Sequence, residues 1–192
     1  MGVATHKNAR FEAEALPHLP ALYNFAVATA GAADAEDLVQ TTCVRALEHF
    51  DSYQPGSNLR AWLFTILRNE WISRQRHRQR RLLIEVDAAD EAIAEIAEDA
   101  PDLEATLIDQ HWSAEIRNAL LALPETHRLP VYLKDVEGFG YAEIAEIVGC
   151  PLGTVMSRLA RGRASLRKSL VQQARERGLV PSPPAVEREH GL

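Results

Sequence analysis

The stretch Gly140-Tyr-Ala-Glu-Ile-Ala-Glu-Ile-Val-Gly-Cys-Pro-Leu-Gly-Thr-Val-Met-Ser-Arg-Leu-Ala-Arg-Gly-Arg163 predicts a helix, a tight turn and a second helix. Ile144 and Val148 fall on one face of the short first helix. Gly149 is expected to end that helix, because glycine accepts the left-handed backbone conformation that closes many helix C-termini. Pro151 suits the first turn of the next helix, where its missing N–H has no partner to lose.

The second helix of this stretch has an apolar stripe and a basic outer face. The stripe recurs at helical spacing and consists of Val155, Leu159, Leu166 and Leu170. The cations are turned away from it, and arginine forks suit phosphate groups and the O6/N7 edge of guanine. A solvated basic face is the alternative, but the coincidence of turn, stripe and charge favours a helix-turn-helix that enters a DNA major groove.

Composition places the chain among ordinary globular proteins, with 192 residues, 46% hydrophobic and 25% charged. This length allows one domain or two small ones. No apolar run approaches the roughly 20 residues that span a bilayer. Residues 1–10 lack the apolar core of a secretory signal. We therefore expect a cytoplasmic protein without membrane insertion.

Neither a metal site, a cofactor site nor a catalytic centre is predicted. Cys43 and Cys150 have no Cys or His at ligand spacing. The carboxylates Asp34, Glu36 and Asp37 are close enough in sequence to suggest a metal-dependent nuclease, but carboxylates at a helix start are the simpler explanation. His77 lies among arginines, where a phosphate contact is expected rather than general base catalysis. An enzyme is thus the disfavoured alternative.

The net charge of −6 hides an uneven distribution. Residues 1–83 carry 10 basic and 8 acidic groups, residues 84–111 carry 10 acidic groups and no basic one, and residues 112–192 carry 11 basic and 9 acidic groups. The acidity is therefore concentrated in the middle, between two mildly basic ends. We expect a flexible acidic linker between two helical domains. One hypothesis is that its acidic groups compete with DNA for the two basic ends of the chain when no DNA is bound.

Helical periodicity covers both ends of the chain. Pro17 and Pro20 leave the start of the first helix open, Gly31 ends it, and Asp34 is the predicted N-cap of the second. A polar loop with Pro-Gly is predicted at 51–58. The predicted helices are 11–30, 35–50, 59–81, 104–123 and 126–136, in addition to the helix-turn-helix. The chain after Leu170 reads as a loose tail.

The run Arg74-Gln-Arg-His-Arg-Gln-Arg-Arg81 has five Arg and one His in eight positions. Like charges at this density repel one another within a helix unless an anion lies near. A helix C-terminus favours one or two cations through its dipole, which does not account for so many. Contact with a polyphosphate backbone is the favoured interpretation.

Three segments, 34–40, 58–69 and 153–163, resemble bacterial sigma factors of the extracytoplasmic-function (ECF) type within the sigma-70 superfamily. The first two resemble sigma region 2 and the third resembles region 4, in the order that the family has. The resemblance implies an all-α fold of two small helical domains. The implied ranges are 10–82 for region 2, 83–104 for the acidic linker, 105–172 for region 4 and 173–192 for a flexible tail.

The resemblance also implies roles for individual residues. The polymerase-binding residues would be Asp37, Gln40 and Thr41. The residues for capture and melting of the −10 promoter element would be Tyr53, Ser57, Asn58, Arg60, Arg68, Arg74, Arg76 and Arg78. The residues for reading the −35 element would be Thr154, Ser157, Arg158, Arg161 and Arg163.

The implied function is that of an alternative sigma factor in a stress or envelope response, which directs core RNA polymerase to specific promoters. Its partners would be core RNA polymerase, promoter DNA and an anti-sigma factor. No catalytic chemistry of its own is implied. The remaining alternative is a stand-alone helix-turn-helix regulator, which would leave the arginine run and the aromatic helix at 59–81 unexplained.

Overall fold

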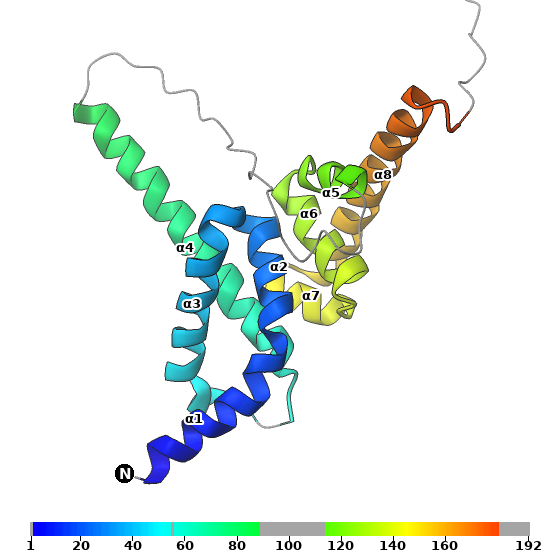
Figure 1. Ribbon diagram of the computed structural model, residues 1–192. Helices are drawn as coiled ribbons and strands as arrows, with labels where there is room; N and C mark the ends of the chain where they lie inside the picture. The colour runs from blue at the N-terminus through cyan, green and yellow to red at the C-terminus, as the bar shows by residue number, and fades with distance from the viewer. Residues whose placement is uncertain (1, 55, 89–113, 181–192) are drawn as a thin grey trace, which may run out of the picture.

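The computed structural model describes residues 2–54, 56–88 and 114–180. Across these ranges the ordered elements are helices, and no strand occurs among them. The N-terminal module comprises 2–88 and the C-terminal module comprises 114–180 (Figure 1). The expected all-α fold of two helical domains is confirmed. None of the helices in the described ranges is both long and apolar enough to cross a membrane.

Prolines and one glycine divide the start of the N-terminal module. The elements are α1 (Gly2–Ala15), the 3₁₀ turn η1 (Leu16–His18) and α2 (Leu19–Ala30). Helix therefore begins at Gly2 and not at Phe11, while Pro17 and Pro20 lie at the junction of α1 and α2. Gly31 ends α2 with a φ of 85°, a conformation that side chains disfavour.

The predicted N-cap of the second helix, Asp34, was wrong. Helix α3 (Ala32–Glu48) begins directly after Gly31, so Asp34 lies inside its first turn and makes no capping bond. The Asp34 carboxylate instead pairs with Arg78 on α4. A short 3₁₀ turn, η2 (Phe50–Ser52), then leads into the polar loop.

Helix α4 (Leu59–Ala88) is the longest element of the N-terminal module. It continues seven residues past its predicted end at Arg81, into the segment expected to be linker. Its apolar side is buried by Leu63, Phe64 and Leu67. The rest of the predicted linker, 89–104, lies outside the described residues, as do 105–113 of the predicted helix 104–123 and the tail from 181.

The C-terminal module contains α5 (Ala114–Leu121), α6 (Glu125–Val131), the π-helical segment η4 (Tyr132–Val136), α7 (Tyr141–Val148) and α8 (Leu152–Glu176). Pro130 lies inside α6 and has no N–H for the helical ladder. The helix widens immediately after it, and the Glu137 N–H donates to the Tyr132 carbonyl over 3.2 Å.

The helix-turn-helix forms as its sequence predicts. Gly149 adopts the left-handed conformation with φ 63° and ψ 44°, and the Cys150 N–H donates to the Ala145 carbonyl. Val155 and Leu159 are buried at the start of α8. Helix α8 continues to Glu176, beyond the predicted loss of periodicity at Leu170.

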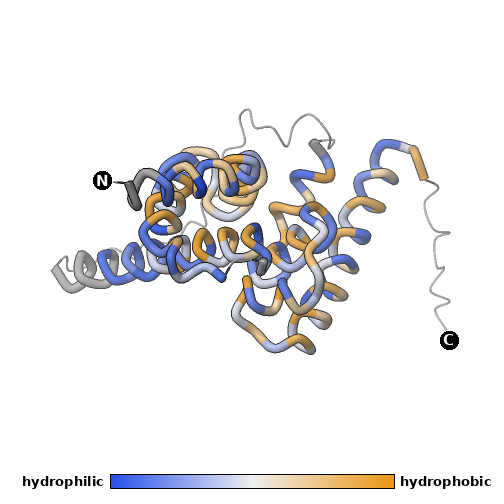
Figure 2. The backbone as a smooth tube through the Cα atoms, turned by 90° about the horizontal axis from the view of Figure 1, so that it is seen from below, coloured by the Kyte–Doolittle hydropathy of each residue, from blue (hydrophilic) through white to orange (hydrophobic). Residues whose placement is uncertain are grey.

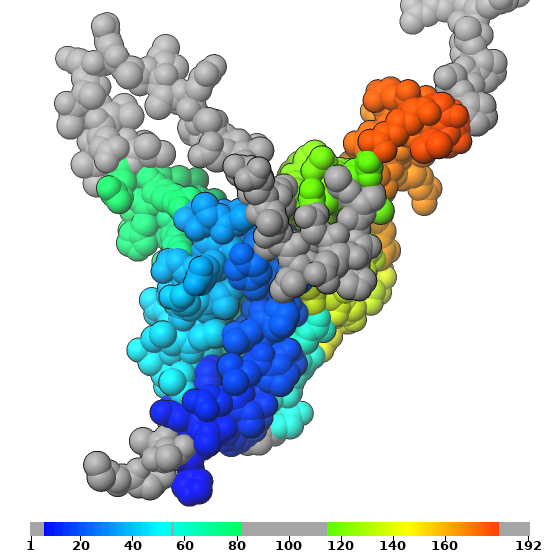
Figure 3. All heavy atoms as spheres, in the orientation of Figure 1, coloured from blue at the N-terminus to red at the C-terminus, as the bar shows by residue number. Residues whose placement is uncertain are grey.

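The two modules share one apolar core. Ring centroids lie 5.6 Å apart for Phe25 and Tyr132, and 5.1 Å apart for Phe64 and Phe139. Phe25, Phe64 and Tyr132 are among the largest side chains that are fully buried. Helices α2 and α4 therefore pack against η4 and α7. Figures 1 and 2 show the C-terminal module to one side of the N-terminal module. We call this contact of α2 and α4 with η4 and α7 the seam, and the space-filling view of Figure 3 shows the two modules touching there.

Candidate nucleic-acid interface

The outer face of α8 presents most of the residues predicted to read the −35 element. Ser157 and Arg161 are exposed, whereas Thr154 and Arg158 are half-buried. Positions 154, 157, 158 and 161 share one helical face because they are separated by three or four residues. The Ser157 hydroxyl donates to the Thr154 carbonyl over 3.0 Å. This face offers hydroxyl groups and the guanidinium groups of Arg158 and Arg161 in the N-terminal half of α8, which is where a recognition helix meets base edges.

Arg163 differs from its neighbours on α8 because it pairs within the module. Its Nε donates to Asp135 Oδ2 over 3.0 Å, and its Nη2 bonds the other carboxylate oxygen. These bonds raise the pKa of the Arg163 guanidinium. Arg163 therefore links α8 to η4, and it would have to break its bonds to Asp135 before its guanidinium could contact DNA.

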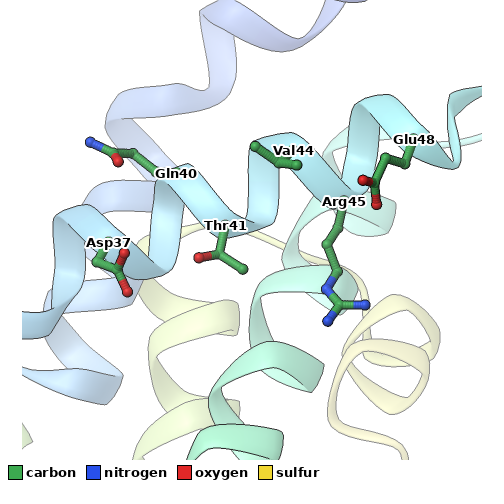
Figure 4. Close-up of a pocket in the computed structure, with 6 residues that line it drawn as sticks. All are labelled: Asp37, Gln40, Thr41, Val44, Arg45 and Glu48. Carbon is green, nitrogen blue, oxygen red and sulfur yellow. The ribbon is translucent and has the colours of Figure 1, made fainter.

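The polymerase-binding residues predicted on α3 line a shallow, open hollow, together with Val44, Arg45 and Glu48. Figure 4 shows Asp37 and Thr41 on the side of the helix that looks toward α4. Val44 was missed by the sequence reasoning although it is 57% exposed in this hollow. Its spacing of four residues from Gln40 was the signal that could have found it.

Two arginines predicted to follow DNA are held by α3 in this structure. Arg74 Nη1 lies 2.7 Å from Asp37 Oδ2, and its Nη2 donates to Thr41 Oγ1 over 2.8 Å. Arg78 pairs with Asp34 one turn earlier on α3. The predicted polymerase surface and the start of the arginine run are thus one connected cluster. Arg76, between Arg74 and Arg78 in the sequence, is exposed.

The loop between η2 and α4 owes its shape to Tyr53. This side chain is only 8% exposed, stacks on Phe50 and tilts against Trp62. Its hydroxyl donates to the Ser57 carbonyl over 2.6 Å, and the Ser57 hydroxyl donates to the Gln54 carbonyl over 2.8 Å. In this arrangement the buried Tyr53 side chain supports the loop from its inner side, and its role as a direct DNA contact stays a prediction.

Helix α1 supports the same loop from the other side. Phe11 meets Phe50 edge to face with ring centroids 5.2 Å apart. The Arg10 guanidinium lies 5.2 Å from the Phe50 ring, and Lys7 Nζ lies 2.7 Å from Asp51 Oδ2. A continuous row of aromatic side chains therefore connects α1 to the loop through η2.

The two candidate DNA residues at the start of α4 contact the C-terminal module. Asn58 Nδ2 donates to Glu143 Oε1, and its Oδ1 accepts from the Ala61 N–H over 3.1 Å, which caps α4. The other oxygen of Glu143 accepts from the Gly140 N–H over 2.7 Å and caps α7. The Glu143 carboxylate therefore caps the N-terminus of α7 and also binds Asn58 of the N-terminal module.

Arg60 lies deeper in the same seam. Its guanidinium pairs with Glu137, donates to the Glu137 carbonyl over 2.8 Å, and lies 4.6 Å from the ring centroid of Phe139 and 5.6 Å from that of Phe64. The Glu137 side chain is only 7% exposed. Burial raises the pKa of the Glu137 carboxyl in spite of Arg60, and burial likewise raises that of the neighbouring Tyr132 phenol, with the Glu137 charge adding to it.

Arg68 completes the seam between α4 and the turn of the helix-turn-helix. Its Nη1 would lie 3.1 Å from a methyl group placed on Gly149. Burial lowers the pKa of the Arg68 guanidinium. The charge of Glu125 acts against this lowering, and the charges of Arg76 and Arg158 add to it. Arg68 thus lies against the C-terminal module, near the Glu125 carboxylate as well as near Arg76 and Arg158.

The structure groups the predicted residues differently from the sequence reasoning. The −35 residues remain together on α8, whereas the −10 residues divide into a supported loop, a buried seam and a cluster with α3. Glu137 and Glu143 were missed, because nothing in their local sequence indicates partners about eighty positions away. In residues 2–54, 56–88 and 114–180, no three His, Cys, Asp or Glu side chains are grouped to hold a metal ion.

The two modules also match known protein families. Residues 16–81 match sigma-70 region 2, and residues 113–166 match sigma-70 region 4. The ECF RNA polymerase sigma factor EcfG of Rhodopseudomonas palustris is 45% identical over 152 residues, which are 79% of this chain and 80% of that protein. The ECF RNA polymerase sigma factor SigE of Mycolicibacterium smegmatis is 37% identical over 143 residues, which are 74% of this chain and 54% of that protein.

Solved structures show the same relationship. The sigma factor RpoE of Bartonella quintana, in complex with the anti-sigma factor NepR, has a TM-score of 0.66 and 37% identity, with 84% of this chain and 97% of that chain covered. CnrH in complex with the cytosolic domain of CnrY has a TM-score of 0.59 at 24% identity, which shows a likeness of fold. With both regions matched in order on two helical modules, and with close relatives over most of its length, the chain belongs to the ECF sigma factors of the sigma-70 superfamily.

Proposed function

We propose that this chain is an alternative sigma factor that directs core RNA polymerase to specific promoters and helps to open them, as part of a stress response. Sigma factors are not enzymes, and in this proposal the polymerase supplies all bond-making chemistry. The observation that carries the proposal is the pair of family matches, one on each module, each with a basic face. A protein that works with the transcription machinery would act in the cytoplasm.

The C-terminal module would read the −35 element as duplex. Arg161 and Ser157 are exposed on α8, where they would meet base edges or phosphates. Arg158 is half-buried on the same face and would complete the contact. Arg163 would contribute through the position of α8, since its guanidinium is bonded to Asp135.

The N-terminal module would capture and melt the −10 element. The loop at 53–58 presents Asn58 at its end, and extrusion of a base costs less free energy when a shaped pocket receives it. Arg76 and the exposed part of the arginine run would follow the phosphates of the strand. We assign 2–88 to this module, because α1 supports the loop and α4 continues to Ala88.

Core polymerase would bind the hollow on α3. The hollow combines an exposed apolar side chain, Val44, with Gln40 and the acidic Asp37. An apolar centre with a polar rim is typical of a protein interface. An anti-sigma factor is the expected regulator, and this expectation is supported by the likeness to RpoE of Bartonella quintana, which was solved with its anti-sigma factor NepR.

Run-off transcription with purified core polymerase across a genomic promoter library tests this proposal. We expect specific transcripts that depend on the added chain, and co-purification of the chain with core polymerase. A stand-alone helix-turn-helix regulator would bind DNA without binding core polymerase. A chain that neither associates with core polymerase nor stimulates any transcript would refute the proposal.

A further inference from the structure

Four exposed apolar residues form a row along α8, which we call the apolar strip. They are Leu152, Met156, Ala160 and Ala164, and they follow one another at intervals of four residues. This spacing advances by about 40° around the helix axis per member, so the four side chains adjoin one another on the surface. Leu152 is 48% exposed and Met156 is 54% exposed. Apolar side chains exposed in a continuous row, and not singly, indicate a binding surface.

The apolar strip lies beside the residues that the proposed function assigns to the −35 element. The buried side of α8 consists of Val155, Leu159 and Gly162. Ser157 directly follows Met156 in the sequence and Arg161 directly follows Ala160, and all four are exposed. The strip and the hydrogen-bonding residues are therefore presented side by side, and one partner that meets the outer side of α8 contacts both.

The charge of α8 indicates the nature of that partner. Residues 152–171 contain four Arg and one Lys, and no Asp or Glu. A helix surface of one positive sign favours a polyanion, and duplex DNA is a polyanion whose major groove admits a helix. The apolar group that base pairs present in this groove is the C5-methyl group of thymine. An apolar strip between cations on a recognition helix is therefore complementary to thymine methyl groups between phosphates.

The sizes of the four side chains agree with this partner. Ala160 and Ala164 are small, so the middle of α8 can approach the floor of a groove closely. Leu152 and Met156 are long and lie in the N-terminal turns of α8, where a recognition helix reaches base edges. Methionine is unbranched and polarizable, so its side chain adapts to an irregular apolar surface.

We propose that Leu152 and Met156 are specificity-determining residues of this chain, which bind thymine methyl groups in the −35 element. This inference rests on the proposed function, because it names a base that the proposed −35 site prefers. Arg158 and Arg161 supply hydrogen bonds and charge at the same site, and the apolar strip adds a preference that does not depend on hydrogen bonds. Deoxyuridine forms the same base pair as thymidine but lacks the methyl group, so it isolates this preference.

Two duplexes and two double variants of the full-length chain test the inference. The first duplex is selected from a random library by the wild-type chain in the presence of core RNA polymerase, and the second carries deoxyuridine in place of thymidine throughout the selected −35 element. Leu152→Ala combined with Met156→Ala shortens the two long side chains of the strip. Leu179→Ala combined with Val180→Ala is the control, because these two apolar residues are also exposed in the same module but lie beyond the end of α8.

We expect the wild-type chain to bind the deoxyuridine duplex about fourfold more weakly for each methyl group that it contacts, which corresponds to ~0.8 kcal/mol. The strip variant should bind the thymidine duplex more weakly than the wild-type chain and should not discriminate between the two duplexes. The control variant should discriminate as the wild-type chain does. Equal affinity of the wild-type chain for both duplexes, or undiminished discrimination by the strip variant, would overturn the inference.

A further variant separates apolar contact from loss of folding. Met156→Leu keeps a long apolar side chain at the exposed position, and circular dichroism establishes that the helices are retained in every variant. This variant is expected to keep most of the discrimination between thymidine and deoxyuridine. If it discriminates no better than the strip variant, apolar contact is not what reads the methyl group, and the inference is overturned.

Binding to core polymerase distinguishes this inference from the proposed function. The strip variant should co-purify with core polymerase as the wild-type chain does. If it loses core polymerase and still discriminates between the duplexes, the strip is a protein-binding surface and the inference is overturned. A wild-type chain that does not associate with core polymerase refutes the proposed function, whereas the comparison of the two duplexes still decides whether α8 reads thymine methyl groups.

Discussion

Replacement of Gly162 by alanine tests how closely α8 and α6 approach each other in the helix-turn-helix module. Gly162 is buried between Arg161 and Arg163 on α8. A methyl group at this position would lie 2.7 Å from Val131 Cγ2 and 3.2 Å from the His127 carbonyl oxygen. The His127 carbonyl is backbone, so α6 as a whole would have to shift.

The expected loss is the difference between two opposing effects. Alanine in place of glycine inside a helix gains about 0.5–1 kcal/mol. Overpacking of a filled core costs about 1–3 kcal/mol. Gly153→Ala on the same helix is the matched control, because a methyl group there meets nothing within 4 Å. The control should be as stable as the wild-type chain or slightly more so, and the Gly162→Ala variant should be less stable than the control by about 1–3 kcal/mol.

Urea denaturation of the full-length chain, followed by circular dichroism, measures this difference as a shift of the midpoint at constant slope. The −35 affinity of the Gly162→Ala variant should also fall, because a displaced α6 moves the elements that brace α8. If the two glycine variants are equally stable, α6 does not approach α8 as the structure shows, and the reasoning is refuted.

Five further substitutions probe the sites individually. Arg161→Ala should weaken binding to −35 duplex DNA by roughly 1–3 kcal/mol if the guanidinium contacts a base edge, and a footprint identical to that of the wild-type chain would contradict this role of Arg161. Arg163→Ala should lower the stability of the fold as well as the affinity for DNA, because it removes the ion pair with Asp135. Val44→Asp places a charge in the exposed hollow on α3 and should lower affinity for core polymerase without changing the circular dichroism spectrum; unchanged co-purification would exclude this surface. Phe11→Ala removes the edge-to-face contact with the aromatic row under the loop, so promoter opening measured by permanganate footprinting should fall while −35 binding persists. Burial raises the pKa of the Glu137 carboxyl above its ordinary 4.5, so the protonated carboxyl stabilises the fold below pH 4.5, and this contribution is lost as pH rises through the raised value. The stability of the wild-type chain relative to the Glu137→Gln variant should therefore fall over that window. A stability difference that does not depend on pH in urea titrations would count against this prediction.

Much of the local structure was predictable because it depends on neighbours in sequence. Gly149 and the apolar positions that follow it specify the helix-turn-helix through a single left-handed residue and a periodic stripe. Gly31 likewise marks the end of α2. The wrong helix boundaries also have local causes. Helix α3 begins directly after Gly31, so Asp34 already lies inside the helix and cannot be its N-cap. Helix α1 lacks the strong apolar periodicity by which a helix is recognised in a sequence.

The sequence by itself determined the two helical modules, their order, the recognition helix and the basic character of α4, since propensity, capping and periodicity act over a few residues. Only the tertiary structure decided that Arg60 lies beneath Phe139, that Asn58 shares a carboxylate with the cap of α7, and that Tyr53 supports its loop from the inside. These contacts join positions that are far apart in the chain or depend on which face a loop turns inward. Their partners are chosen by the packing of whole helices and by the need to satisfy buried charges, and no local pattern specifies either.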